Sequence, residues 1–389
     1  IDTVELGGDL EIALKTTSAG IELQRNPSIF KMGVFKRLFS PLIEEWFNGI
    51  RFGVKDADLI VLSIGSLFVG LSCIEKCPNI KAIGIYTFPL IPTAEFSPPG
   101  IGEKSVSLLN CINSLKWKVS EYINISCYRE KLNELRSSIN LPPLTFNYYQ
   151  MIQATMKKPM TTATIYSKHL IARPTDWQEN DHIVGPILDE DQHNFEPSPT
   201  LLDFFNKWKS EKIIFVGLGS MMGAMLGNNE QIQFLNNIQA ALKNNNCKAV
   251  ISLVGYQQTD INNLSNTDNI FYLKQIIPHS WLFLNVSAVI HHGGAGTTHA
   301  SLRYGLPTLI LSFVVDQPFN GDRIFINKLG PRHIPMAKTN VKNLTNAIHD
   351  LINRNYSMYQ MNAKKISELI KNEDGIGQCV RLIEAELAK

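Results

Sequence analysis

The chain has 389 residues, of which 44% are hydrophobic and 19% charged, with a formal net charge of +2. This length is too great for one compact core, and roughly 100–200 residues per domain predicts two domains. The near-neutral charge and the lack of a Lys/Arg cluster argue against nucleic acid as a partner. No apolar run reaches the roughly 18–20 residues that cross a bilayer, so a cytoplasmic location is expected, with peripheral membrane contact left open.

The N-terminal part, residues 1–188, has the pattern of an α/β domain. Asp58–Ile64 and Lys81–Tyr86 are expected strands, the first of them buried, and Val119–Ile139 has helical periodicity. A doubly wound domain opens with a buried strand and a tight loop, but the first such strand here begins near Leu59. We therefore expect this domain to lack its first strand and helix.

A polar segment with two prolines follows, which predicts a linker over residues 189–204. Residues 205–375 then alternate short apolar strands with helices, the pattern of a parallel, doubly wound sheet. Helices are expected over residues 231–243, 278–286, 298–304 and 320–329. Residues 376–389 are predicted to form an amphipathic helix that packs on one of the domains.

The strongest signal for function is a glycine-rich loop, His291–Thr298, between a strand and a helix. Glycines 293, 294 and 296 let the backbone approach a ligand. Free N–H groups and the positive end of the helix dipole then form a site for a diphosphate. His292 adds a ring N–H and Thr297 a hydroxyl. The alternative is a plain strand–helix turn in which the threonines cap the helix.

Two more polar loops follow strands that are expected in the same sheet. Gly217-Leu218-Gly219-Ser220 offers close approach and a hydroxyl, and Val315-Asp316-Gln317 offers groups that suit sugar hydroxyls. Asp316 alone could be a helix N-cap. Three polar loops at one edge of a parallel sheet favour a shared pocket.

The run from Ile276 to Arg323, IIPHSWLF…SAVIHHGGAGTTHASLRYGLPTLILSFVVDQPFNGDR, closely resembles the donor-binding signature of UDP-dependent glycosyltransferases. It is most similar to the sterol 3-beta-glucosyltransferases and related antibiotic glycosyltransferases. The segments RPTDWQENDHIVGPIL, FVGLGSMMG and IYTFPLIPTAEF resemble other parts of that branch. The resemblance is dense over residues 165–335 and thin elsewhere.

This resemblance implies the GT-B fold, in which two Rossmann-like domains face each other across a cleft. It implies a UDP-sugar bound by the C-terminal domain, a lipid or sterol acceptor bound by the N-terminal domain, and neither a metal nor a cofactor. The donor-binding positions that it implies are Ser220, Ile277, Pro278, His279, His292, Gly294, Ala295, Gly296, Thr297, Asp316 and Gln317. Trp281 is either a ring-stacking residue or a core residue.

The implied reaction is inverting transfer of a hexose, expected to be glucose, to an acceptor hydroxyl, with UDP as the leaving group. In the family, the base that deprotonates the acceptor lies on the loop after the first strand, which has no counterpart here. Asp9, in the Gly7-Gly8-Asp9 turn, is the remaining candidate for the base, and we expect it to be structural.

Three other interpretations were weighed against an active transferase. A non-catalytic or degenerate protein of the same fold, binding lipid or nucleotide, is the main alternative. A dinucleotide-dependent oxidoreductase would need an acidic residue about 20 positions after a G-x-G-x-x-G loop, and none stands out after Gly217. A metal hydrolase is disfavoured because His291, His292 and His299 lack acidic partners at ligand spacing.

Overall fold

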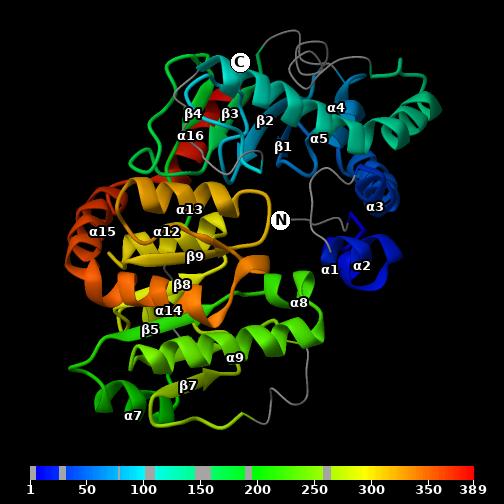
Figure 1. The fold of residues 1–389 in the computed structure, drawn as a ribbon. Helices are drawn as coiled ribbons and strands as arrows, with labels where there is room; N and C mark the ends of the chain where they lie inside the picture. The colour runs from blue at the N-terminus through cyan, green and yellow to red at the C-terminus, as the bar shows by residue number, and fades with distance from the viewer. Residues whose placement is uncertain are drawn as a thin grey trace.

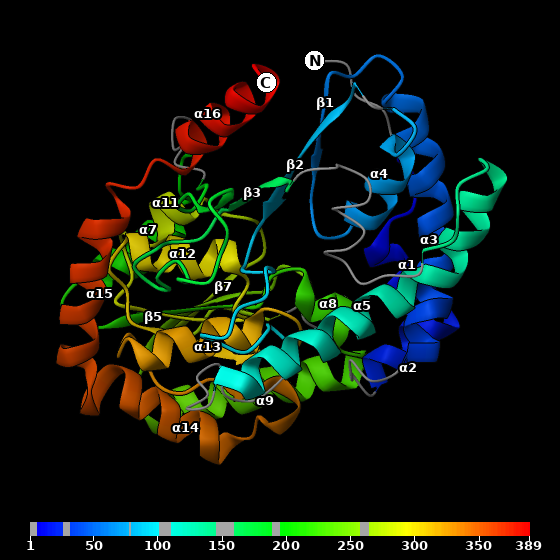
Figure 2. The ribbon, with the colours of Figure 1, turned by 90° about the horizontal axis from the view of Figure 1, so that it is seen from above.

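The structure, a computed structural model, describes residues 6–25, 32–77, 79–100, 110–144, 159–188, 195–256 and 264–389. Two parallel sheets, of four and six strands, form the centres of an N-terminal and a C-terminal half (Figure 1). Helices cover the strands of both halves (Figure 2). The fold class predicted from the sequence, α/β with parallel sheets in two domains, is confirmed.

The strand order of the six-stranded sheet is β10-β9-β8-β5-β6-β7. The chain therefore builds outward from β5 to β7, returns to the centre, and builds the other way from β8 to β10. This reversal creates a switch point between β5 and β8, where ligands bind in doubly wound sheets. The strands are β5 (Ile213–Gly217), β6 (Lys248–Ser252), β7 (Ile270–Leu273), β8 (Ala288–His291), β9 (Thr308–Ser312) and β10 (Ile334–Pro335).

Side chains of each central strand alternate between two apolar layers, because successive strand residues point to opposite faces. In β5, Ile214 and Val216 pack with α9 (Asn228–Asn244) and α14 (Val341–His349). Ile213 and Phe215 pack on the other face, with α7 (Pro199–Lys207) and α11 (His279–Leu282). Both faces are covered, which explains the continuous apolar runs of the sequence. The remaining elements of this half are α8 (Met221–Met225), α12 (Ala295–Arg303), α13 (Gln317–Ile326), η1 (Met336–Lys338), η2 (Asp350–Arg354) and α15 (Tyr356–Ile370).

The N-terminal sheet has the order β1-β2-β3-β4, so its described strands progress in one direction. They are β1 (Leu59–Leu62), β2 (Lys81–Tyr86), β3 (Thr161–Thr164) and β4 (Asp181–Ile183). The expectation that the first strand is buried was wrong, since Val61 is 46% exposed. Because β1 pairs only with β2 among the described strands, it is less covered than the strands inside the sheet.

Five helices are described on this side of the molecule: α1 (Leu10–Thr16), α2 (Ser18–Arg25), α3 (Met32–Gly53), α4 (Leu67–Ile74) and α5 (Asn110–Ser138). All residues of α4 are buried, and the long helices α3 and α5 pack against each other. None of the described helices combines the length and apolar character that crossing a bilayer requires.

The boundary between the halves differs from the predicted linker over 189–204. Residues 189–194 lie outside the described residues, but α7 begins at Pro199, well inside the predicted range. Ser198 starts this helix because its side chain accepts from the N–H of Leu201, and Pro199 fits the first helical position. Leu201 and Phe204 then pack on the C-terminal sheet, so the segment belongs to that half.

The last helix, α16 (Gly375–Leu387), returns to the N-terminal half and packs on β2 and β3. Thr161 donates to a carboxylate oxygen of Glu386 at 2.9 Å, and Lys81 donates to the carbonyl of Leu387 at 2.7 Å. The chain thus crosses between the halves twice, before α7 and before α16. One apolar cluster also spans both halves, joining Tyr166 and Trp117 to Phe319 and Ile324.

Candidate functional site

Two of the polar loops identified in the sequence begin side by side at the switch point. Gly217, the last residue of β5, is the strand partner of His291, the last residue of β8. A β-carbon built on Gly219 would lie 3.8 Å from Cε1 of His292, so the two loops face each other. Ser220 follows at the start of α8, where its side chain is exposed and makes no capping hydrogen bond.

Helix α12 begins at Ala295, three residues before the predicted start at 298. Gly294 takes the N-cap position in an extended conformation, and its carbonyl accepts from the N–H of Thr298 at 3.0 Å. The alternative interpretation, in which Thr298 caps the helix, was wrong for this residue, because its hydroxyl donates back to the carbonyl of Gly294, at 2.9 Å. The first-turn amides therefore belong to Ala295, Gly296 and Thr297. These N–H groups have no partner within the helix and point out of its N-terminus.

The three glycines of this loop have different structural roles. Gly293 has φ of +95°, and an added β-carbon would lie 2.6 Å from Cγ2 of Ile310. At Gly294 the added atom would lie 2.6 Å from Nε2 of His292. Gly296 is the opposite case, since nothing lies within 4 Å of its added β-carbon. The loop is therefore packed tightly at Gly293 and Gly294 and open at Gly296. We call this open N-terminus of α12, at Ala295–Thr297, the helix mouth.

The two histidines of the loop are both neutral at pH 7. Burial and, to a smaller extent, His279 together lower the pKa of His292 to about 4. Burial likewise lowers the pKa of His291, whose Nδ1 accepts from the N–H of Gly293 at 3.0 Å. Nδ1 of His292 is buried and has no hydrogen-bond partner among the described residues. A buried unpaired nitrogen costs free energy, so a ligand at the helix mouth that hydrogen-bonds to it would be favoured.

Asp316 lies at the same helix mouth. Its carboxylate accepts from the backbone N–H of Ala295 and from Nδ2 of Asn320, the latter at 3.0 Å. It occupies the N-cap position of α13, as the alternative interpretation expected, but its side chain makes no capping bond there. Burial raises its pKa to about 6. The carboxylate is thus buried, held by donors and next to the amides of α12.

The residues on either side of Asp316 add to the site. Gln317 is buried, and its Oε1 accepts from the N–H of Phe313 at 2.7 Å. Its Nε2 amide is the part that can donate to a sugar hydroxyl. Val315 has φ of +60°, a strained conformation for a β-branched residue. Such strain is often found at functional sites, and Val315 directs a 46% exposed side chain away from the core.

The segment Ile277-Pro278-His279 borders the loop from the other side. The ring of His279 stacks on Phe283 with centroids 4.6 Å apart, and burial lowers its pKa. It lies close enough to both loop histidines for its protonated form to lower their pKa values. Ile277 is buried and Pro278 is the N-cap of α11. Trp281 points elsewhere, because it packs on Phe195 and Phe205 in the core.

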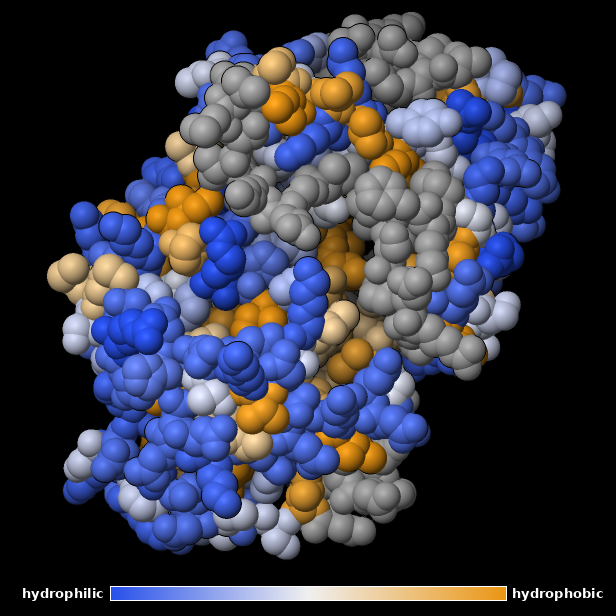
Figure 3. Space-filling model, viewed as in Figure 1, coloured by the Kyte–Doolittle hydropathy of each residue, from blue (hydrophilic) through white to orange (hydrophobic). Residues whose placement is uncertain are grey.

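A cavity of about 370 Å³ lies in the N-terminal half and reaches the C-terminal half at Val315. Its walls come from α3, α4, α5 and the proline-rich stretch that ends at Gly100. A β-carbon built on Gly100 would lie 3.6 Å from the carbonyl of Val315. In Figure 3, apolar side chains are visible in the hollow between the halves. The apolar lining includes Phe35, Phe39, Trp46, Leu67, Phe68, Phe88, Trp117 and Tyr128.

Few polar groups interrupt this lining: Ser120, Glu121 and Asn124 on α5. Burial raises the pKa of Glu121, and its Oε1 has no hydrogen-bond partner among the described residues. An apolar cavity with a few polar groups is the usual form of a small-molecule site. The sequence did not reveal it, because its walls come from helices far apart in the chain.

Asp9 precedes Leu10, which lines the cavity, but Asp9 itself is not among the lining residues. Its Oδ1 accepts from the N–H of Ile12 at 3.0 Å, so Asp9 caps the start of α1. Gly7 and Gly8, with φ of +73° and +69°, form the turn before it. No cluster of three or more His, Cys, Asp or Glu side chains that could hold a metal ion occurs in the described ranges.

The structure brings most of the sequence-predicted positions together. Gly294–Thr297, His292, Asp316 and Gln317 gather at one helix mouth, with Ser220 and Ile277–His279 on neighbouring loops. Sequence reasoning missed Asn320, which links Asp316 to the glycine loop. Its position four residues after Asp316 in a helix was the available signal, because such residues share a helix face.

Comparisons with known proteins agree with this geometry. A protein family described as "Erythromycin biosynthesis protein CIII-like, C-terminal domain" matches residues 237–373. A sterol 3-beta-glucosyltransferase of Arabidopsis thaliana is 29% identical over 297 residues, 76% of this chain and 44% of the relative. A sterol 3-beta-glucosyltransferase of Debaryomyces hansenii is 32% identical over 365 residues, 90% of this chain and 22% of the relative. The chain thus spans less than half the length of these relatives.

Solved structures show the same fold at low sequence identity. The calicheamicin glycosyltransferase CalG4 superposes with a TM-score of 0.61 at 15% identity, covering 91% of this chain and 82% of the other. The glycosyltransferase VinC in complex with dTDP gives a TM-score of 0.60 at 15% identity, covering 99% and 88%. These neighbours have the GT-B fold. With the signature in residues 276–323, the matches show that the chain is similar to UDP-glycosyltransferases.

Proposed function

We propose that this chain transfers a hexosyl group, glucose in the first instance, from a UDP-sugar to a hydroxyl group of a lipid acceptor, with a sterol as the leading candidate. The observation that carries the proposal is the helix mouth at Ala295–Thr297. The amides of Gly296 and Thr297, the ring of His292 and the carboxylate of Asp316, which accepts from the N–H of Ala295, meet there. The diphosphate would bind the amides and the imidazole, and the sugar would bind Asp316 and Gln317.

The acceptor would bind in the apolar cavity of the N-terminal half. The cavity is bounded at one end by Val315, the neighbour of Asp316, so an acceptor filling it would reach the sugar position. The large apolar lining favours a lipid or sterol over a polar acceptor. Glu121 offers an acceptor hydroxyl a hydrogen bond. The names of the plant and yeast relatives support a sterol.

The reaction would be a direct displacement at the anomeric carbon, with inversion and without a metal. The acceptor oxygen forms a bond to that carbon, the bond to the β-phosphate oxygen breaks, and UDP leaves with the electron pair. A base takes the acceptor proton, and we assign that base to no described residue. Negative charge grows on the β-phosphate, where amides fixed at a helix N-terminus and a neutral imidazole stabilise it.

Two measurements test the proposal. UDP should raise the melting temperature more than AMP or NAD does, since the site is built for a diphosphate and a uracil. Label from UDP-[¹⁴C]glucose should pass to a sterol in a lipid panel. Equal stabilisation by NAD would contradict the donor assignment. Binding of UDP without transfer to any acceptor would instead favour a non-catalytic binding protein.

A further inference from the structure

A buried chain of hydrogen bonds connects the N-terminal half to the candidate sugar-binding carboxylate. The hydroxyl of Tyr166, just after β3, donates to Oδ1 of Asn320 on α13 at 2.9 Å. Nδ2 of Asn320 donates to Oδ2 of Asp316 at 3.0 Å and to the carbonyl of Gly293 at 2.7 Å. Tyr166 and Asn320 are both completely buried, so this chain excludes water.

The neighbouring residue makes a second link to the donor helix. The N–H of Ser167 donates to Nε2 of His299 on α12 at 3.1 Å. Nδ1 of His299 lies 2.7 Å from the carbonyl of Ala295, which can only accept, so Nδ1 carries the proton. Burial lowers the pKa of His299 to about 4, which keeps this neutral form. Tyr166 and Ser167 thus contact both helices that bound the donor site.

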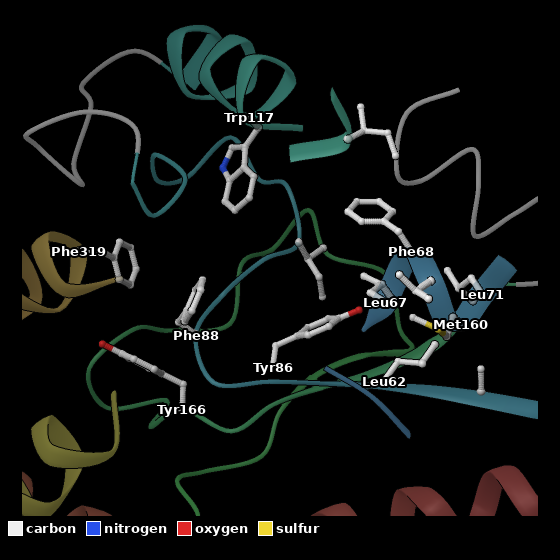
Figure 4. Packing of buried hydrophobic residues seen from close by; sticks show 14 of the residues in the cluster. Leu62, Leu67, Phe68, Leu71, Tyr86, Phe88, Trp117, Met160, Tyr166 and Phe319 are labelled. Carbon is white, nitrogen blue, oxygen red and sulfur yellow. The ribbon is translucent and has the colours of Figure 1, made fainter. Parts of the chain in front are cut away.

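The rings around Tyr166 leave it little freedom. It meets the ring of His299 edge-on at 4.4 Å and that of Phe319 at 6.4 Å. In Figure 4 its hydroxyl points away from Tyr86 and Leu62, toward the C-terminal helices. A ring held in this way delivers its hydroxyl to one place, and its bond to Oδ1 acts together with the two bonds that Nδ2 donates to hold the Asn320 amide in one orientation.

We propose that Tyr166 is a positioning residue for the donor sugar. Its hydroxyl orients the amide of Asn320, and that amide fixes the carboxylate of Asp316 and the turn at Gly293. If the amide turned over, its oxygen would face the oxygens of Asp316 and Gly293, which cannot donate to it. The half that carries the acceptor cavity therefore sets the geometry of sugar recognition. This inference rests on the proposed function, because it takes Asp316 to hold the sugar.

The test compares Tyr166→Phe with Tyr359→Phe, a matched control. Tyr359 is also buried and donates one hydroxyl bond, to Asp350 at 2.6 Å, and neither residue is among those placed at the candidate site. Calorimetry gives the dissociation constants of UDP and UDP-glucose for each protein, and their ratio isolates the contribution of the glucosyl group. We expect Tyr166→Phe to reduce the preference for UDP-glucose over UDP by about threefold to tenfold, the effect of one hydrogen bond. The control should keep the wild-type ratio.

The outcomes separate this inference from the proposed function. If the wild-type protein does not bind UDP, the proposed function fails. If it does, and Tyr166→Phe keeps the wild-type ratio, the positioning role is overturned. A similar change in ratio in Tyr359→Phe would also overturn it, because the effect would then follow from lost stability alone. Should Tyr166→Phe fail to fold, Asn320→Ser, which shortens the link from the other side, is judged by the same ratio.

Discussion

Replacing Gly296 by alanine should make the protein more stable and its UDP binding weaker. Gly296 is the second residue of α12, and nothing lies within 4 Å of an added β-carbon. The substitution therefore causes no clash with protein atoms. Alanine also loses less backbone entropy than glycine in a helix, a gain of up to about 1 kcal/mol. That gain corresponds to a rise in melting temperature of roughly 1–3 °C.

The effect on ligand binding has the opposite sign. Cα–Cβ bonds in a helix tilt toward its N-terminus, so the new methyl group leans toward the helix mouth where the diphosphate is expected. Forcing a methyl group into a packed contact costs about 1–3 kcal/mol, which is about 5- to 150-fold in the dissociation constant of UDP. Titration calorimetry with UDP and a thermal melt without ligand measure the two effects.

A matched control separates the loss of binding from the change in the helix. Gly33 is the second residue of α3, and its added β-carbon would meet only a guanidinium nitrogen of Arg37, at 3.9 Å. Gly33→Ala should raise the melting temperature similarly and leave UDP binding unchanged. An unchanged UDP affinity in Gly296→Ala would refute the diphosphate site at the mouth of α12.

Three further outcomes are expected. His292→Ala should slow glucosyl transfer by about 10²–10³, the effect of losing one donor to a developing charge. The melting temperature should change little, because the buried Nδ1 has no hydrogen bond to lose. The exposed His349→Ala is the control, and near-normal turnover of His292→Ala would contradict the role of His292. Burial raises the pKa of Asp316 to about 6, so the folded protein holds this proton up to a higher pH than the unfolded chain does. The contribution of Asp316 to stability should therefore fall as the pH rises from about 4 to 6. The preference for UDP-glucose over UDP should weaken below pH 6. Both trends should disappear in Asp316→Asn, and thermal melts and titration calorimetry across pH 4–8 measure them. Gly65→Leu should raise the KM for the acceptor without changing UDP affinity, because Gly65 lines the cavity and has open space at its β-carbon. The control is Gly53→Leu, at an exposed glycine with equally open space. An unchanged acceptor KM in Gly65→Leu would argue against the cavity as the acceptor site.

The C-terminal half could be predicted well because its strands are short apolar runs buried on both faces. Lys248–Ser252 and Thr308–Ser312 are two such strands, and they fall in the expected alternation of strands and helices over residues 205–375. The helix starts were less accurate, since α12 and α13 both begin three residues early. In each case the first turn carries glycine or proline, which hides the helical pattern. These first turns contain Gly296 and Gln317, so the wrong helix starts affected residues of the candidate site.

The N-terminal half was harder to read. Helix α5 begins at Asn110 rather than near 119. The short strands β3 and β4 were missed, since TTAT and DHI lack the apolar run of a buried strand. The hydroxyls of Thr161 and Thr162 have buried partners, as when Thr162 donates to Asp181 at 2.8 Å. Partners nineteen residues away leave no local signal.

The same limit explains why Asp316 could be assigned from its motif while Tyr166 could not. Asp316 stands beside Gln317 in a loop after a strand, and that position indicates a ligand contact without any tertiary information. Tyr166 acts, on our proposal, through Asn320, which lies 154 residues away in the sequence. Its contribution depends on a tertiary contact between the two folded halves, and a single sequence does not show such a contact. Residues that position a binding group across a domain boundary are therefore found only from a structure of both halves. Here the hydrogen-bond chain from Tyr166 ends at the carboxylate of Asp316, which we assign to the sugar.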